Sequence, residues 1–377
     1  SGTAMAKPIV RFFLVSLVVF SFGPLWAQSA PKARQNPKIA AMKSVVAGKN
    51  EFAAGLYGQL QRLQPGNICF SPYSVSTALS MSALGARGNT GKQYKEVLHI
   101  DLAPKQYHPA VLNLQKEIRK GKHSDKAYVF EMANGVWAQE GYRFRSDFVK
   151  PLRGFYGDGA FTEFNLRNRT DYARKRINLW AERETNRMIP DMVPDNLIDK
   201  RTVLLVMSGV IFRGNWASGF PKAGTRAAQF RTPGGKVVRV PMMQQSVRLP
   251  YAEVKDVVKL VELPYFGDDL SMVVILPVVK DETWDESFTE LEKELSAKLL
   301  TTWLQALKRQ PVMVNLPRFE INTAYDLNRE LQGAGLTDAF STSKADFSGM
   351  AARNRPPLYL KSVLHRVRLE VRETGVQ

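Results

Sequence analysis

Side chains capable of catalysis are present in this sequence, but none has the spacing that a common reaction requires. The four histidines, at positions 99, 108, 123 and 365, do not form the H-E-x-x-H pattern that presents two imidazoles to zinc from one helix. Met207-Ser208-Gly209 lacks the first glycine of a nucleophile elbow. We therefore predict no zinc hydrolase and no serine hydrolase.

The glycine-rich segment Gly85–Lys92 also fails as a phosphate-binding loop. Its outer glycines are one residue too far apart, and Gln93 stands where such a loop needs Ser or Thr. The carboxylates of Asp268 and Asp269 follow a glycine in a turn-like segment, which is typical of a solvated loop. We expect a binding or conformational protein rather than an enzyme, with no metal site and no required cofactor.

The last stretch, His365–Gln377, combines the pattern of a β-strand with a glycine-containing segment that can bend. Val367, Leu369 and Val371 alternate with charged residues, which predicts a half-buried β-strand. The strand runs into 373–377, where a glycine allows the backbone to bend. A strand that enters a hinge is expected to lead into a further segment.

The composition allows a large hydrophobic core but does not identify a binding partner. With 377 residues, of which 44% are hydrophobic, length alone permits two or three domains. The net charge of +18 suggests a polyanion partner, whether nucleic acid, glycosaminoglycan or an anionic surface. The single cysteine, Cys69, excludes a disulfide within the chain and is expected to be a small buried apolar residue.

The N-terminal region has the pattern of an export signal. Residues 1–4 precede a methionine and are interpreted as a cloning remnant. Residues 5–27 combine basic residues, a short apolar run and a small residue at a possible cleavage point, which is typical of a signal peptide. Residues 28–37 are predicted to be a disordered basic leader. We expect a secreted protein, extracellular or, in a bacterium, periplasmic, with no membrane segment in its mature form.

Apolar periodicity predicts a mixed α+β protein. Ser71-Pro72 is a helix start, with an N-cap residue followed by a first-turn proline. The segments 202–212 and 270–276 are apolar on both faces and should be strands in covered sheets, and 312–316 suggests a strand nearer an edge. Further helices are predicted at 38–63, 73–84, 172–188, 284–307 and 324–331.

A basic cluster lies on a predicted helix over 113–126. A sulfated polysaccharide is one ligand for such a cluster, although most charge runs are only solvated faces. The candidate polyanion-binding residues are Lys116, Arg119, Lys120, Lys122 and Lys126.

Several motifs together resemble the serpin family of protease inhibitors. The segment 67–90, NICFSPYSVSTALSMSALGARGNT, is similar to the helix B signature of serpins. Segments 178–186, 212–216, 262–277 and 336–349 are similar to further serpin motifs, so the resemblance runs from about residue 40 to the end. It implies one domain over 38–377, with three β-sheets and about nine helices.

The resemblance implies a mechanism based on a moving strand. In inhibitory serpins a protease cleaves a reactive-centre loop, and the hinge side of that loop inserts into sheet A while the acylated protease is dragged along and distorted. Several positions match functional regions of the family. They are the hinge Glu373, Thr374, Gly375, Val376 and Gln377, the shutter Ser71, Ser74, Ser208 and His365, and Trp216 at the breach.

Two positions depart from the family pattern, and the remainder of the fold is expected beyond Gln377. Ser208 stands where an asparagine is usual, and Arg368 stands where an apolar residue is usual. The reactive-centre loop and the final strands are expected to lie in a missing C-terminal part or a companion fragment.

We predict a suicide-type inhibitor of a serine or cysteine protease, which forms a covalent complex with its target. A non-inhibitory serpin acting as carrier or chaperone, and a protein that binds a heparin-like polyanion, stay open as alternatives. Small residues after the hinge would favour the inhibitor, whereas proline or charged residues would favour a non-inhibitory serpin.

Overall fold

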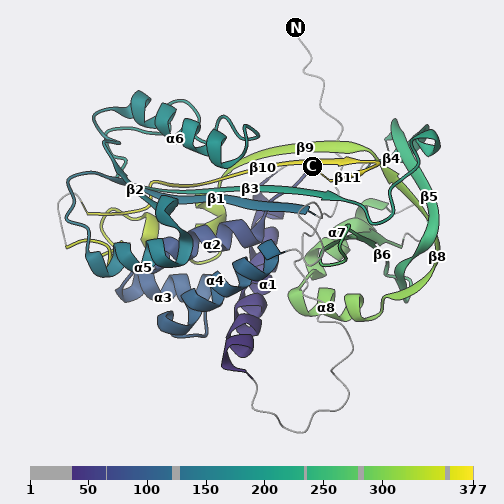
Figure 1. The fold of residues 1–377 in the computed structure, drawn as a ribbon, viewed down its shortest axis with the longest axis horizontal. Helices are drawn as coiled ribbons and strands as arrows, with labels where there is room; N and C mark the ends of the chain where they lie inside the picture. Colours follow the sequence, from purple (N-terminus) through teal and green to yellow (C-terminus); the bar gives the residue numbers. More distant parts are fainter. Residues whose placement is uncertain are drawn as a thin grey trace.

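The computed structural model in Figure 1 describes residues 36–64, 66–120, 128–232, 236–278, 284–352 and 357–376. The predicted signal peptide, most of the predicted leader and Gln377 lie outside these residues. The described chain is α+β, as expected: a large central sheet is flanked by helices, and a second sheet lies at one end.

The central sheet has six strands with a parallel seam in its middle. Its order is β2-β1-β3-β11-β10-β9, and β3 pairs antiparallel with β1 but parallel with β10. The predicted strands at 202–212 and 365–371 correspond to β3 and β10. The bounds are β1 Tyr128–Gln139, β2 Phe161–Phe164, β3 Leu204–Asn215, β9 Phe319–Asp326, β10 Ser362–Arg372 and β11 Gly375–Val376.

Helices cover both faces of this sheet, which explains why β3 is apolar on both sides. One helix, α6 (Thr170–Glu184), lies on one face, and the helices α1 to α5 lie on the other (Figure 1). Leu205 and Met207 pack in the same cluster as α6, whereas Val206 packs in the cluster that contains α2. The five helices are α1 Pro37–Leu63, α2 Pro72–Ala83, α3 Gly88–Val97, α4 Pro104–Lys120 and α5 Ser146–Tyr156.

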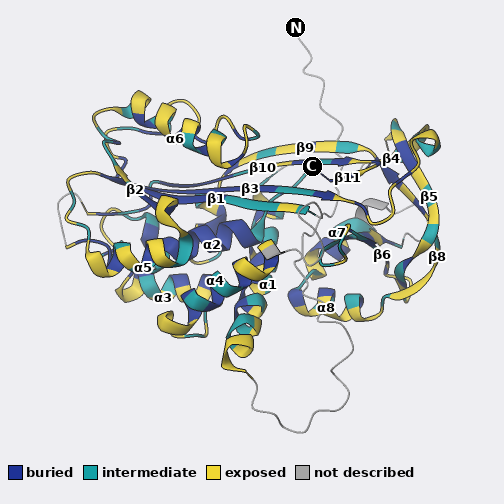
Figure 2. Ribbon diagram, in the orientation of Figure 1, coloured by how far each residue is buried: buried dark blue, intermediate teal, exposed yellow. Residues whose placement is uncertain are grey.

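The start of α2 is the one predicted from Ser71-Pro72. The Ser71 hydroxyl accepts a hydrogen bond from the backbone N–H of Ser74 at 3.3 Å, and Pro72 is the first helical residue. All residues from Tyr73 to Ser82 are buried, as Figure 2 shows by the dark blue colour of α2 beneath the sheet. Cys69, just before this helix, is also buried, and burial raises the pKa of its thiol to about 12.

The remaining strands form a second sheet around one long strand, β5. β5 pairs with β4 near its start, with β8 along its middle and with β6 at its end, and β7 pairs with β6. Because β5 is continuous, the expected three sheets are joined into two hydrogen-bonded sheets in the described part of the chain. The bounds are β4 Arg226–Arg231, β5 Val237–Val254, β6 Val258–Pro264, β7 Ser271–Pro277 and β8 Lys308–Pro317.

Two predicted helices differ from the structure. The segment 284–307 contains two helices, α7 (Trp284–Glu294) and α8 (Ala297–Gln305), because the Ser296 hydroxyl accepts from the N–H of Leu299 and caps a new helix. The helix expected at 324–331 is wrong at its start, since Tyr325 pairs with β10 and α9 runs only from Asn328 to Gly333. Sheet pairing outweighs local helix propensity there. The described residues thus contain nine α-helices.

Candidate functional site

The predicted hinge lies where the direct pairing between β3 and β10 ends. β3 and β10 pair in parallel over 205–210 and 362–367. Beyond these residues β11 lies between them and is antiparallel to both strands. The chain turns back at 373–374, so the hinge already contributes a short strand to the sheet. Figure 1 shows β11 beside the C-terminal end of the chain, between β10 and β3.

Three N–H donors hold the turn of the hinge. The backbone N–H of Trp216 donates to the carbonyl of Thr374 at 2.9 Å, and the N–H of Phe220 donates to the carbonyl of Glu373 at 2.9 Å. The indole Nε1–H of Trp216 donates to the carbonyl of Arg372 at 2.9 Å. The structure thus places Trp216, the predicted breach residue, against both sides of the turn.

The side chain of Glu373 fastens the same turn to the neighbouring sheet. The Thr225 hydroxyl donates to its Oε1 at 2.8 Å, and the Arg318 guanidinium lies 3.8 Å from that oxygen. The N–H of Glu373 itself, the Thr225 hydroxyl and the charges of Arg318 and Lys222 lower the pKa of this carboxyl, against a smaller opposing effect of burial. At neutral pH the hinge is therefore held by an ionised carboxylate.

Gly375 fits because two backbones approach closely. A Cβ atom on Gly375 would lie 2.7 Å from the Cα of Asn215 and would collide with the carbonyl oxygen of Gly214. Val376, the next residue, is 4% exposed and packs in an apolar cluster with Trp216 and Tyr265. The side chain of Val376 therefore faces the core.

The four predicted shutter residues meet beneath the seam. Ser208 on β3 pairs with His365 on β10 and, on its other side, with Asn134 on β1. These three side chains therefore form a row across three strands, and they contact Ser71 and Ser74 at the start of α2. His365, Ser208 and Ser74 have no solvent exposure.

The donors fix the direction of every hydrogen bond in this network. The backbone N–H of Ser71 donates to Nε2 of His365 at 2.9 Å, so the ring proton is on Nδ1, which donates to the Ser208 carbonyl at 2.9 Å. The Ser208 hydroxyl donates to Ser74 Oγ at 3.0 Å, and Ser74 donates to Asn134 Oδ1 at 2.8 Å. Burial lowers the pKa of His365 to about 4, so the ring is neutral.

Asn134 is a member of this network that sequence reasoning missed. Its Nδ2 donates to the Ser74 carbonyl at 3.0 Å, so two hydrogen bonds join Asn134 on β1 to Ser74 on α2. The short Ser208 side chain thus has an amide beside it, supplied from the adjacent strand. A signal was present, because asparagine is depleted from strands and Asn134 interrupts the apolar stretch from Met132 to Ala138.

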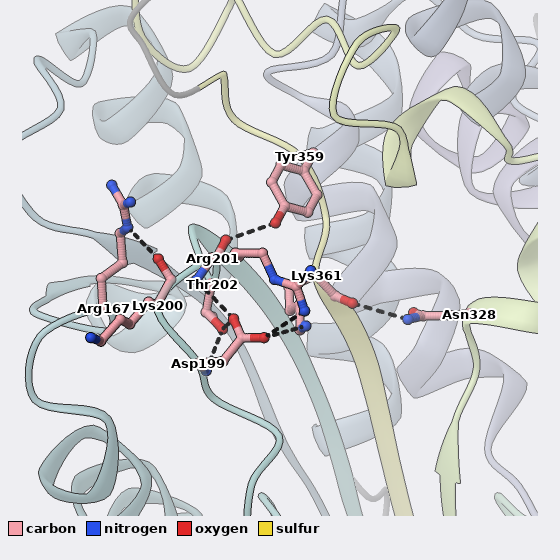
Figure 3. A network of polar contacts seen from close by, with 8 residues as sticks. All are labelled: Arg167, Asp199, Lys200, Arg201, Thr202, Asn328, Tyr359 and Lys361. Atoms are coloured by element: carbon pink, nitrogen blue, oxygen red, sulfur yellow. Dashed lines mark hydrogen bonds and ion pairs between the residues drawn. The ribbon is translucent and has the colours of Figure 1, made fainter.

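A second polar network joins the other end of the seam (Figure 3). Lys361, just before β10, donates through Nζ to Asp199 Oδ2 at 2.9 Å, and its N–H donates to the carbonyl of Leu204. Tyr359 donates to the carbonyl of Arg201 at 2.7 Å. Burial opposes ionisation of Asp199, but hydrogen bonds from Lys361 and the N–H of Arg201, with the Lys361 charge, lower its pKa to about 2. We call Asp199, Arg201, Tyr359 and Lys361 the seam clamp.

Arg368, the charged residue where an apolar one is usual, faces solvent. Its guanidinium pairs with Glu320 on β9 at 3.0 Å, and both side chains are nearly half exposed. The charged side of β10 is therefore solvated at this position, and Arg368 carries no burial cost.

The predicted polyanion cluster is only partly described and is separate from the seam. Lys116 and Arg119 are exposed on α4, and Lys120 is the last residue of that helix. Lys122 and Lys126 lie outside the described residues. Among the helices that the structure describes, none has the length and apolar character needed to span a bilayer. The described residues also contain no group of three or more His, Cys, Asp or Glu side chains suited to a metal ion.

Comparisons with known proteins agree with this geometry. The family profile described as "Serpin (serine protease inhibitor)" matches residues 47–377. The leukocyte elastase inhibitor of Xenopus tropicalis is 33% identical over 339 residues, covering 89% of this chain and 88% of that relative. Serpin B3 of Homo sapiens is 32% identical over 351 residues, with the same coverage of 89% and 88%.

Solved structures show the same fold. The crystal structure of uncleaved ovalbumin is similar with a TM-score of 0.80 and 27% identity, covering 88% of this chain and 87% of that one. Ovalbumin from emu (Dromaius novaehollandiae) has a TM-score of 0.80 and 28% identity, with the same coverage of 88% and 87%.

Proposed function

The chain belongs to the serpin family, and on this premise we propose that it is a suicide-type protease inhibitor. In this proposal a serine or cysteine protease attacks a reactive-centre loop that continues from the hinge beyond Gln377. The cleaved loop enters the central sheet between β3 and β10, and the acylated protease is distorted before it can deacylate. The chain is thus attacked by an enzyme and is not itself one.

The observation that carries this proposal is the position of β11. The sheet already accepts a strand between β3 and β10 at the hinge end, with hydrogen-bonded pairs on both sides. Further insertion requires only that the parallel pairing over 205–210 and 362–367 opens in the same way. A buried, uncharged Val376 is the side chain that such a strand needs at its leading end.

The number of backbone hydrogen bonds favours insertion of the loop strand between β3 and β10. The parallel pairing of β3 with β10 covers six residue pairs, which corresponds to roughly six ladder hydrogen bonds. A strand placed between them forms two ladders, or roughly twelve bonds, so the net gain is about six bonds at about 1 kcal/mol each. The uncleaved state is therefore metastable in this proposal, and the polar networks beneath and beyond the seam keep it closed.

Export remains a proposal that rests on the pattern of residues 5–27. The target protease would then be extracellular or periplasmic. A non-inhibitory serpin, acting as carrier or chaperone, would use the same scaffold without inserting the loop, and the experiment below separates the two.

The test is a covalent complex in the full-length protein. Incubation with a panel of serine and cysteine proteases should give a complex that survives boiling in SDS. Val376→Arg should instead be cleaved as a substrate, because insertion would bury an unpaired charge. Arg372→Gln is the control, because the Arg372 side chain is exposed and pairs with Glu370 on the same strand, so this variant should still form the complex. Equal yields of complex from Val376→Arg and the control would refute strand insertion at this seam.

A further inference from the structure

The segment that follows α6 crosses the seam between β3 and β10. Residues 186–193 lie on the face of the central sheet that α6 covers, and Figure 1 shows α6 on this face. Ile189 and Met192 of this segment pack in one cluster with Met207 of β3 and Leu364 of β10. We call residues 186–193 the seam strap, because they contact both strands of the seam.

Two arginines fasten the seam strap, one from each strand. On β10, Arg366 donates from Nε to the carbonyl of Met192 at 3.4 Å. On β3, Arg213 donates from Nη2 to Sδ of Met188 at 3.1 Å. The strap is therefore hydrogen-bonded to both strands that have to separate when the seam opens.

The contact with β3 leaves the arginine incompletely satisfied. A thioether sulfur is a weak acceptor, whereas a guanidinium has five N–H donors. Nε of Arg213 is buried and has no hydrogen-bond partner among the described residues. A buried donor without an acceptor costs free energy. What this position lacks is an oxygen atom close to the sulfur of Met188.

The backbone fixes Met188 at this place, and solvent reaches its side chain. Asn186 and Arg187 have positive φ values of 45° and 65°, so the chain turns sharply at the end of α6. The N–H of Met188 then donates to the carbonyl of Thr185 at 2.8 Å. The side chain of Met188 is only partly buried, whereas Met192 has no exposure. A dissolved oxidant can therefore reach Met188.

We propose that Met188 is a reversible oxidation site whose sulfoxide fastens the seam strap to Arg213. A peroxide transfers one oxygen atom to Sδ: the S–O bond forms, the O–O bond breaks, sulfur loses two electrons and hydrogen peroxide is reduced to water. The three rotatable bonds of the side chain let the sulfoxide oxygen turn toward Nη2 and Nε. A hydrogen bond from a charged donor is about twice as strong as one between neutral groups.

This arrangement gives oxidation of Met188 an unusual sign. Oxidation of methionine normally disrupts packing, because it places a polar group among apolar neighbours. Met132 also accepts a hydrogen bond, but from the neutral amide of Asn134 at 3.8 Å. Within the described chain, Met188 is the methionine whose sulfur accepts from a charged donor. Its sulfoxide should therefore tighten the structure around it.

The experiment measures hydrogen exchange before and after treatment with hydrogen peroxide, in a Met313→Leu background. This background removes a methionine that is 72% exposed. Treatment continues until peptide mass spectrometry shows complete addition of one oxygen at Met188. Exchange of the Ile189 amide, which donates to Thr185, and of the amides of 205–210 should slow at least about threefold. Methionine sulfoxide reductases should restore the original rates.

Three variants separate the role of the Met188–Arg213 contact from general oxidation. Met188→Leu, given the same treatment, is the matched control, because it retains the remaining methionines and should show no slowing. Arg213→Leu should be oxidised at Met188 but should exchange faster afterwards, because the sulfoxide has lost its donor. Arg213→Lys keeps the charge but not the two donor positions, so it should show a smaller slowing.

Any of three results would overturn the proposal. One is faster exchange of the Ile189 amide in the oxidised protein, which would mean that the sulfoxide disrupts the strap. Another is equal slowing in Met188→Leu or Arg213→Leu. The last is an unoxidised Met188 when Met42, which is also partly buried, is fully oxidised. These results are independent of protease inhibition, because exchange is measured without a protease.

Discussion

Protonation of His365 should weaken the folded state by an amount that follows from its burial. The ring accepts the Ser71 N–H at Nε2 and donates from Nδ1 to Ser208, so it works only while neutral. Its pKa falls from 6.5 to about 4 in the folded protein because of burial, with a partly opposing effect of the Ser208 hydrogen bond. A difference of about 2.5 pH units corresponds to about 3 kcal/mol of unfolding free energy.

Whether the unfolding free energy rises or falls with pH depends on which state, folded or unfolded, takes up the proton first. As pH falls, the unfolded chain is protonated near pH 6.5 and the folded chain only near pH 4. The contribution of His365 is therefore complete above pH 6.5, is lost progressively between pH 6.5 and about 4, and is constant below. The loss acts at the seam, because His365 joins β10 to β3 and α2.

Denaturant unfolding at several pH values tests this reasoning. The unfolding free energy of the native protein minus that of His365→Gln should shrink by about 3 kcal/mol from pH 7 to pH 4. His108 is also buried with a pKa lowered to about 4 by burial, but it is present in both proteins and cancels in the difference. A difference that is constant across this pH range would refute the role of a neutral His365 in closing the seam.

Three further outcomes are expected. Burial lowers the pKa of Lys49 to about 7, so the unfolding free energy should rise between pH 7 and about 10.5 in the native protein but not in Lys49→Met, as measured by urea unfolding. Gly375→Ala should displace the hinge, because the added Cβ would collide with the backbone of Gly214. The Trp216 amide, which donates to the carbonyl of Thr374, should then exchange its hydrogen faster, and unchanged exchange would count against the observed packing. Lys361→Met should cost about 1 kcal/mol and speed exchange in β10 near Val363, whereas the exposed control Lys298→Met should do neither.

Much of the fold was predictable because it depends on local patterns. The N-cap at Ser71, the strand alternation of 365–371 and the apolar run of 202–212 each identify an element directly. The helix error at 324–331 has a physical origin, since Tyr325 is held in β9 by pairing with His365, a contact far away in sequence. Long-range pairing is invisible to a window of neighbouring residues.

The site was predictable only in part for the same reason. Resemblance to the serpins selected four residues as a predicted shutter, and the structure brings these four together. It did not find Asn134, because the row of Asn134, Ser208 and His365 depends on the registers of three strands. The seam clamp was likewise missed, since Asp199 and Lys361 are ordinary charged residues until β3 and β10 bring them to 2.9 Å.

The central claim is that a strand can be added between β3 and β10, and the thermal midpoint of the full-length protein before and after loop cleavage tests it most directly. A gain of about six hydrogen bonds, with newly buried side chains, should raise the midpoint on the order of 10 °C. The amides of 205–210 and 362–367 should exchange more slowly at the same time, because each strand gains a new partner. An unchanged or lower midpoint after complete cleavage would contradict the account.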